Sequence, residues 1–255
     1  MWFLRKRRRR ALESTPLTAS ERSIVARNLV VYGLLAAVDR AELEGKTRVL
    51  LAEKSFEGCG GLELDDEHRV TIAAYGALLL LHRDSGYYPV LDSVLVYPTA
   101  FLAPVRHPVG NVAAIETEEE RLGESSSAGS LVLSWEDALA DIEDPGAGIS
   151  VVIHEFAHQL DEEDSSGEGV PTLQSRAEYK AWHEVFSREY EAHCDDIDRG
   201  RRTLLDEYAA ESPAEFFAVA SEAFFLIPLD LRMRHPDLYR RLADYYRQDP
   251  AEWGI

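Results

Sequence analysis

The segment 149–160 places two histidines and a glutamate inside an otherwise apolar helical stretch. His154, Glu155 and His158 form the pattern H-E-x-x-H, and residues four apart lie on one face of a helix. Glu155 is the only charged residue between positions 149 and 157, so the flanks predict a buried helix. Burying such polar groups without partners costs on the order of 2–7 kcal/mol. The fold must therefore supply these three side chains with partners in its interior.

A metal ion satisfies this requirement, because two imidazoles one helical turn apart can bind the same ion. Zinc suits two imidazoles and one carboxylate, with the fourth position open to water. Glu155 can reach such a water without binding the ion, and is the candidate general base. The alternative is a pair of ordinary core histidines with local hydrogen bonds. The buried pattern favours the metal, and we expect one zinc ion per chain.

The third ligand is not fixed by spacing. The longer motif H-E-x-x-H-x-x-G-x-x-H fails, since Asp161 and Asp164 occupy its last two defined positions. A carboxylate on a later helix is expected instead, and the candidates are Glu211, Glu215 and Glu222. Glu215 comes first and Glu222 next, but Ser212 and Glu215 also match a capping box, which needs no metal. Whichever glutamate is not the ligand suits a supporting role behind a ligand histidine.

Two further side chains near these segments are candidates. Tyr208 precedes Glu215 by seven residues, and its hydroxyl could donate a hydrogen bond to an oxyanion. The simpler interpretation is a half-buried packing residue. Asp161 directly follows the metal motif and could accept a hydrogen bond from a ligand histidine.

Hydrophobic periodicity predicts an α+β fold that is mostly helical, with a small mixed sheet beside the helix of the motif. Residues 131–135 are the candidate edge strand, where a peptide could add by main-chain hydrogen bonds. The segment 123–130 is expected to be a flexible loop because it is rich in Gly and Ser. The predicted helices span 17–39, 42–56, 67–82, 149–160, 173–193, 212–227 and 236–246, and the predicted strands span 90–97, 111–117 and 131–135.

Charge is distributed very unevenly. The net charge is −19, and removing the six positive charges at residues 5–10 leaves −25 for the remainder. Such a body repels nucleic acid and anionic membrane, so no nucleic-acid partner is expected. The basic tip could touch phospholipid or an acidic partner. The simpler hypothesis is a flexible basic tail over residues 1–15, followed by one domain over 16–255.

Two features of the sequence bear on the cellular location of the protein, namely its few cysteines and its lack of a long apolar segment. The chain has only two cysteines, Cys59 and Cys194, so a disulfide framework is not expected and a cytoplasmic location is the default. No apolar run approaches the length of a transmembrane helix.

The chain resembles the Mlc titration factor A family of zinc peptidases across nearly its whole length. The matching blocks include FEGCGGLE, VLVYP, VIHEFAHQLD, SPAEFFAV and YYRQDP, at residues 56–63, 94–98, 152–161, 212–219 and 245–250. The family is gluzincin-like and similar in fold to the catalytic domain of anthrax lethal factor. The resemblance therefore implies a zincin-like fold.

The resemblance also implies roles for particular residues. His154 and His158 would bind zinc, Glu155 would act as the base, Glu215 would be the third ligand and Tyr208 would assist catalysis. The substrate would be a peptide, hydrolysed by a metal-activated water. The alternative that the family implies is a regulatory protein that sequesters a transcriptional repressor, with weak or incidental peptidase activity.

Overall fold

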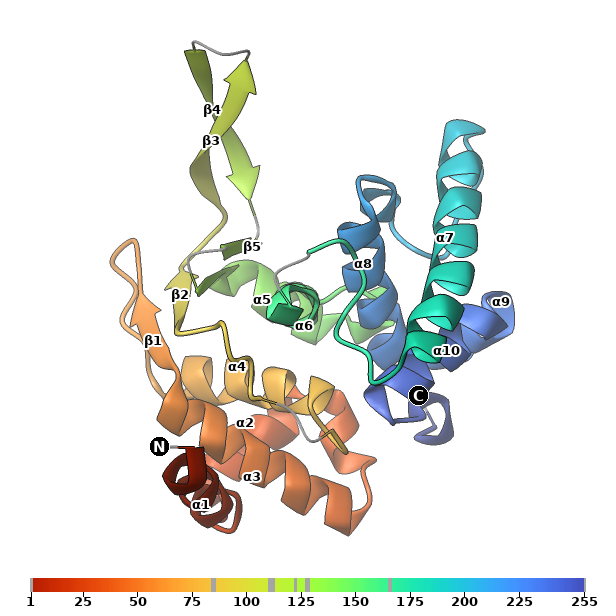
Figure 1. The fold of residues 1–255 in the computed structure, drawn as a ribbon. Coiled ribbons are helices and arrows are strands. Elements are labelled where there is room, and N and C mark those ends of the chain that lie inside the picture. Colours follow the sequence, from red (N-terminus) through yellow and green to blue (C-terminus); the bar gives the residue numbers. More distant parts are fainter. Residues whose placement is uncertain are drawn as a thin grey trace.

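The structure of the protein is a computed structural model that describes residues 2–83, 86–109, 113–121, 123–126, 129–164 and 167–254. Helices dominate it. In Figure 1, α1 to α4 lie below a small sheet, and α7 to α10 lie to the right of the central helix α6 (Val151–Asp161). The predicted mostly helical α+β class is confirmed. None of the described helices is both long and apolar enough to cross a bilayer.

The main sheet has four strands in the order β1 (Ser55–Gly58), β2 (Ser93–Tyr97), β6 (Ser130–Ser134) and β5 (Gly123–Ser126). The first three run parallel and β5 pairs with β6 in the antiparallel direction, so the predicted mixed sheet is confirmed. It lies beside α6, which contacts both β5 and β6.

Two predictions about this sheet are wrong. The expected edge strand at 131–135 is the interior strand β6, whose Leu131 and Leu133 are fully buried. The edge beside it is β5, within the segment that we expected to be a loop. Pairing of β5 with β6 uses main-chain groups only, which a composition of Gly, Glu and Ser does not reveal.

A second sheet has two antiparallel strands, β3 (Phe101–Val109) and β4 (Ala113–Arg121). The predicted strand 111–117 falls on β4 from residue 113 onward, and its first two residues lie outside the described part of the chain. The sequence did not predict β3, because Pro104 and Pro108 remove main-chain donors from it.

The predicted helix at 17–39 is divided in the structure. Helix α2 (Ala19–Asn28) ends at Asn28, a short 3-10 turn η1 (Val30–Gly33) follows, and α3 (Ala37–Glu53) begins a new direction. Contacts to α4 (Asp66–Leu79) explain the break. The Asn28 amide donates to Thr71 Oγ1 at 2.8 Å, and the Asn28 carbonyl accepts from the Tyr75 hydroxyl at 3.0 Å. Tertiary hydrogen bonds thus end a helix that apolar spacing alone would continue.

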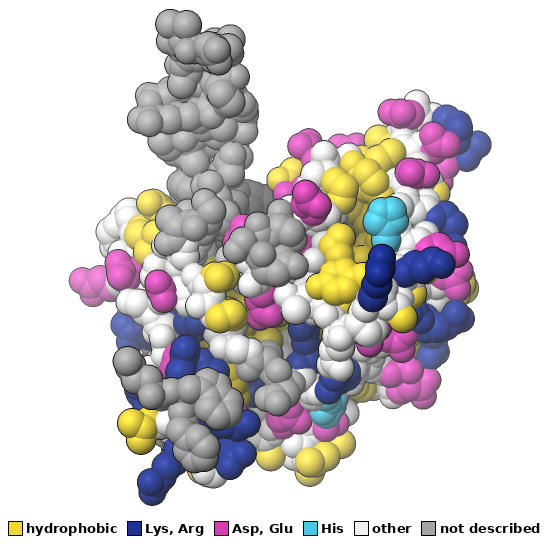
Figure 2. All heavy atoms as spheres, viewed as in Figure 1, with side chains coloured by type: hydrophobic (Ala, Val, Ile, Leu, Met, Phe, Trp, Pro, Cys, Tyr) yellow, Lys and Arg dark blue, Asp and Glu magenta, His cyan; other side chains and the backbone are white. Residues whose placement is uncertain are grey.

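The basic N-terminal segment also differs from expectation. Residues 2–13 form helix α1 (Trp2–Glu13), which packs against α3. Arg9 donates to both carboxylate oxygens of Glu53, at 2.9 and 2.7 Å, and to the carbonyl of Gly86 at 2.9 Å. Figure 2 shows Lys and Arg side chains at the lower left, where Figure 1 places α1. An arginine on one face of the segment thus holds it to the body.

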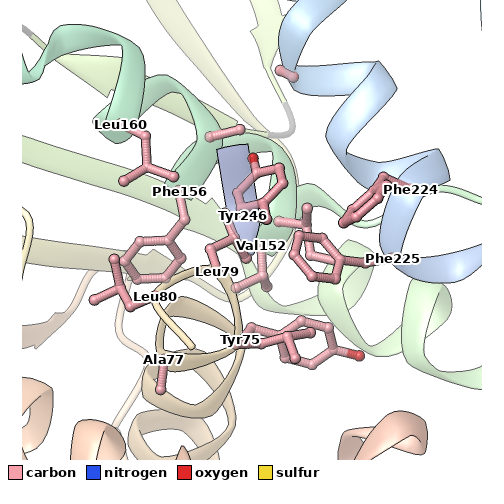
Figure 3. Close-up of a cluster of buried hydrophobic side chains, with 14 of the residues drawn as sticks. Tyr75, Ala77, Leu79, Leu80, Val152, Phe156, Leu160, Phe224, Phe225 and Tyr246 are labelled. Carbon is pink, nitrogen blue, oxygen red and sulfur yellow. The ribbon is translucent and has the colours of Figure 1, made fainter. Parts of the chain in front are cut away.

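The core forms where α4, α6, α8 (Pro213–Leu226) and α10 (Pro236–Tyr246) meet. Figure 3 shows Phe156 of α6 beside Leu80 at the end of α4, with Phe224 on the opposite side of the cluster and Tyr246 between them in this view. A Cβ atom at Gly76 would come within 2.7 Å of the Phe156 ring, so α4 and α6 pack unusually close. This packing fixes the apolar face of α6 and leaves its other face to the polar side chains.

The remaining helices complete the C-terminal half. They are α5 (Trp135–Glu143), α7 (Arg176–Asp198) and α9 (Pro228–Arg234), with a 3-10 turn η4 (Glu207–Ala210) directly before α8. The predicted helices at 173–193, 212–227 and 236–246 correspond to α7, α8 and α10, each within a few residues of its observed ends.

Candidate metal centre

Helix α6 begins where the sequence provides a cap. Ser150 is the N-cap residue, and its hydroxyl accepts a hydrogen bond from Ile153 N at 3.3 Å. Phe156 and Leu160 face the core, so His154 and His158 share the other side of the helix, one turn apart. Their side chains are only 13% and 14% exposed. Core packing thus aims both imidazoles in the same direction.

Helix α8 brings a carboxylate to the same place. Ser212 caps the helix by accepting from Glu215 N at 3.2 Å, and Pro213 follows in the first turn. The Glu215 side chain does not return to the cap. Its Oε2 lies 2.9 Å from His154 Nε2 and 3.2 Å from His158 Nε2. The carboxylate therefore joins the histidines and leaves the capping box half formed.

The three side chains form a convergent set of donor atoms. His154 Nε2 and His158 Nε2 are 3.1 Å apart, and one donor atom from each of His154, His158 and Glu215 lies within 4.8 Å of the others. Two imidazoles and a carboxylate are ligands that fit a divalent ion such as zinc. These residues could therefore hold a metal ion.

The three glutamates that the sequence offered as candidates for the third metal ligand lie in different places in the structure. Glu211 is exposed, and Glu215 faces both histidines. Glu222 is buried, accepts from His154 Nδ1 at 2.7 Å, and accepts from Ser150 N at 2.6 Å. It thus links the imidazole to the start of its own helix. In the neutral imidazole, this hydrogen bond favours the tautomer with the proton on Nδ1, which leaves Nε2 able to bind a metal ion.

Glu155 lies on α6 between the two histidines in sequence and is 3% exposed. Its Oε2 has no hydrogen-bond partner among the described residues. Burial raises the pKa of Glu155 to about 7, and the nearby imidazoles of His154 and His158 oppose that rise. A buried carboxylate with an unsatisfied oxygen, beside side chains that could hold a metal ion, fits a site built around a water or substrate atom.

The protonation of the cluster follows from its hydrogen bonds. Burial alone would raise the pKa of Glu215, but hydrogen bonds from His154 and His158 lower it to about 2. Burial alone would lower the pKa of His154, but hydrogen bonds to Glu215 and Glu222 raise it well above its ordinary value. Positive charge is therefore favoured between these side chains, and a bound cation would take the place of the protons.

Tyr208 lies in η4, beside the histidines. Asp206 caps this turn by accepting from Tyr208 N at 2.9 Å, and η4 packs against α8. The Tyr208 side chain is 49% exposed, and its ring centre is 5.9 Å from that of His154. The structure thus brings this residue to the open side of the cluster.

The sequence did not predict the hydrogen bonds and close packing that hold the loop after α6 in place. Asp161, which we considered as a partner for a histidine, accepts from Gly169 N at 2.7 Å. Gly169 has a φ of +75°, its carbonyl accepts from Trp182 Nε1 at 3.1 Å, and a Cβ there would overlap the carbonyl of Pro213. The end of α6 is thereby held against the start of α8, two residues before Glu215. The only signal was the Gly169-Val-Pro sequence after an acidic loop.

Comparison with known proteins assigns a class. A family model described as glucose-regulated metallo-peptidase M90 matches residues 3–247. An uncharacterised protein of Synechocystis sp. is 38% identical over 245 residues, which cover 95% of this chain and 89% of that protein. Proteins named Mlc titration factor A are 30% identical in Salmonella agona and 31% in Klebsiella pneumoniae. Each match covers 86% of this chain and more than four fifths of the relative.

The fold and the family match together define a metallopeptidase-type protein with a zincin-like fold. The chain belongs to the glucose-regulated metallo-peptidase M90 family. The resemblance to the Mlc titration factor A family is confirmed by the named relatives.

Proposed function

We propose that this protein is a zinc-dependent peptidase whose metal is held by His154, His158 and Glu215. The observation that supports it most is the convergence of two imidazole nitrogens and one carboxylate oxygen next to the buried Glu155. Three protein ligands leave a position open, as in catalytic rather than structural zinc sites. Membership of a metallopeptidase family supports the same class of activity.

Each residue has a separate role in this proposal. Zinc, when bound, supplies Lewis acidity that polarises the peptide carbonyl and lowers the pKa of water. Glu155 accepts the proton of the attacking water and delivers it to the leaving amine. The Tyr208 hydroxyl donates a hydrogen bond to the oxyanion of the tetrahedral intermediate. Glu222 holds the His154 ring in place through Nδ1.

A second candidate function follows from the relatives that are named Mlc titration factor A. In this alternative the protein binds and sequesters a transcriptional repressor, and its peptidase activity is weak or incidental. The two functions separate in a Glu155→Gln variant, which would lose peptide turnover but would keep repressor binding.

Metal content in ligand variants tests the proposed site. Glu215→Gln should lose most of its zinc after dialysis, because one of three protein ligands becomes a neutral amide. Glu211→Gln is the matched control, since Glu211 is exposed four residues earlier. It should retain zinc and peptide turnover. Equal zinc content in the wild type and Glu215→Gln would show that Glu215 is not a metal ligand.

A further inference from the structure

We propose that the outer face of α1 is a docking site for an anionic phospholipid surface. This inference is independent of the peptidase proposal. It starts from the contrast between six consecutive positive charges at residues 5–10 and a remainder that carries −25. The structure places Arg5 and Arg9 against the body and leaves Arg7, Arg8 and Arg10 exposed.

One side of α1 faces the body. Arg5 and Arg9 lie one turn apart and both pair with Glu53, at 3.1 and 2.7 Å. The guanidinium of Arg9 also lies over the Tyr87 ring, 4.6 Å from its centre, and the Tyr87 hydroxyl donates to Glu13 at the end of the helix. These contacts span the helix from its first turns to its last, so α1 is held in a defined orientation.

Away from the docked side, α1 carries arginines that the body does not neutralise. At the spacing of an α-helix, Arg7 and Arg10 lie roughly opposite Arg5 and Arg9, and Arg8 lies on the flank. Arg7, Arg8 and Arg10 are exposed, and none of them makes an ion pair with any residue that the structure describes. Elsewhere on this acidic protein, some exposed arginines pair with nearby carboxylates, as Arg199 and Arg201 do. On α1, three exposed arginines without such a partner in the described part of the chain lie within four consecutive residues. The outer face of α1 is therefore an unneutralised positive surface in a protein of opposite charge.

The residues before the arginines favour a lipid surface over another polyanion. Trp2, Phe3 and Leu4 directly precede the basic run, and Leu4 is 72% exposed. Aromatic and aliphatic side chains beside Lys and Arg are typical of segments that lie in the interface of a membrane. Basic clusters of this size attract anionic headgroups, by about 1 kcal/mol for each Lys or Arg near the surface.

The geometry allows the acidic body to remain away from the lipid. In Figure 1, α1 lies at the end of the molecule opposite α7 and α9. A flat bilayer can touch this end alone, and charges beyond about 10 Å are largely screened at physiological salt. A nucleic acid has no apolar layer into which residues such as Leu4 could insert. A long duplex would also pass close to the acidic surface of the body, which repels it.

Vesicle sedimentation tests this proposal with the full-length protein. The wild type should bind vesicles of phosphatidylcholine mixed with phosphatidylglycerol, should not bind pure phosphatidylcholine vesicles, and should dissociate as salt is raised. The triple variant Arg7→Gln, Arg8→Gln, Arg10→Gln should bind about a hundredfold more weakly. It retains Arg5 and Arg9, so α1 should stay docked. A control that replaces exposed Arg202, Arg234 and Arg240 by Gln changes net charge equally and should bind like the wild type.

Three results would overturn the proposal. The first is no binding of the wild type to the anionic vesicles. The second is equal binding by the α1 variant and the control variant, which would show that the interaction depends on net charge alone. The third is tighter binding of the wild type to duplex DNA than to the vesicles, with the loss confined to the α1 variant, which would assign the surface to a nucleic acid.

Discussion

Glu222 accepts a hydrogen bond from His154 Nδ1 at 2.7 Å, although the two residues are 68 positions apart in the chain. The other oxygen of Glu222 accepts from Ser150 N at 2.6 Å, at the N-terminus of the helix that carries His154. One buried carboxylate therefore orients an imidazole and caps its helix. Both effects depend on the two carboxylate oxygens of this side chain, which each accept one hydrogen bond.

Glu222→Gln should weaken zinc binding by about 10–100-fold, as is common when the partner behind a ligand histidine is lost. The amide keeps the shape of the side chain but has only one acceptor, so either His154 or Ser150 N loses its partner. Zinc affinity measured by competition with a chelating dye checks this. Unchanged affinity would show that Glu222 has only a structural role.

Tyr208→Phe should lower kcat for peptide hydrolysis by about 10²–10³, because the variant lacks the hydroxyl that we propose donates to the oxyanion. KM and zinc content should change little. Tyr190→Phe is the control, because the Tyr190 hydroxyl donates to the carbonyl of Ala210 at the end of η4, at 3.1 Å. It removes a hydroxyl that supports the same turn. If both variants lose activity equally, Tyr208 acts only through the position of η4.

Gly169→Ala should lower the free energy of unfolding by about 2–5 kcal/mol, since it combines a left-handed backbone with an overlap at Pro213. Gly167 is a matched control, because it has a φ of +57° and open space around a Cβ among the described residues. Gly167→Ala should cost only about 1–2 kcal/mol. Urea denaturation of both variants measures the difference. Equal losses would show that the contact with Pro213 is easily relieved.

Glu53→Gln should reduce stability by about 1.5–3 kcal/mol at neutral pH, because hydrogen bonds to charged Arg9 are weakened. The hydrogen bond from Arg9 lowers the pKa of Glu53 below its ordinary value of 4.5. The unfolded state therefore binds a proton at higher pH than the folded state, and stability falls as the pH drops below 4.5. The free energies of unfolding of the wild type and Glu53→Gln should therefore approach each other below pH 4.5. A difference that stays constant with pH would contradict the ion pair. The control Glu63→Gln changes an exposed glutamate, and it should have the stability of the wild type both at neutral pH and below pH 4.5.

Local sequence signals were sufficient to predict the two helices that carry the candidate metal site. Ser212 caps α8 as predicted, and the apolar flanks correctly predicted a buried face for α6. The cap of α6 by Ser150 was not among the predictions. Spacing could not separate Glu215 from Glu222, because residues seven apart share one helical face. The structure separates them, since Glu215 lies opposite the Nε2 atoms of both histidines and Glu222 lies behind Nδ1 of one.

The features that the sequence did not predict depend on contacts between distant segments. Helix α2 stops at Asn28 because Tyr75 and Thr71, on another helix, provide its hydrogen bonds. Helix α1 is docked because Arg9 meets Glu53, and a run of arginines alone predicts only a solvated tail. Strand β5 exists because β6 offers a free edge to its main chain. In each case the decisive partner lies elsewhere in the chain.

Zinc content and peptide turnover, measured together on the wild type and Glu155→Gln, test the central claim most directly. We predict about one zinc ion per chain in both proteins. Turnover of a peptide panel should fall by about 10²–10⁴ in the variant alone, since the substitution removes the proposed general base and none of the proposed ligands. Glu191→Gln, on the exposed side of α7, should match the wild type in both measurements. Absence of zinc from both proteins, or full turnover by Glu155→Gln, would contradict the account.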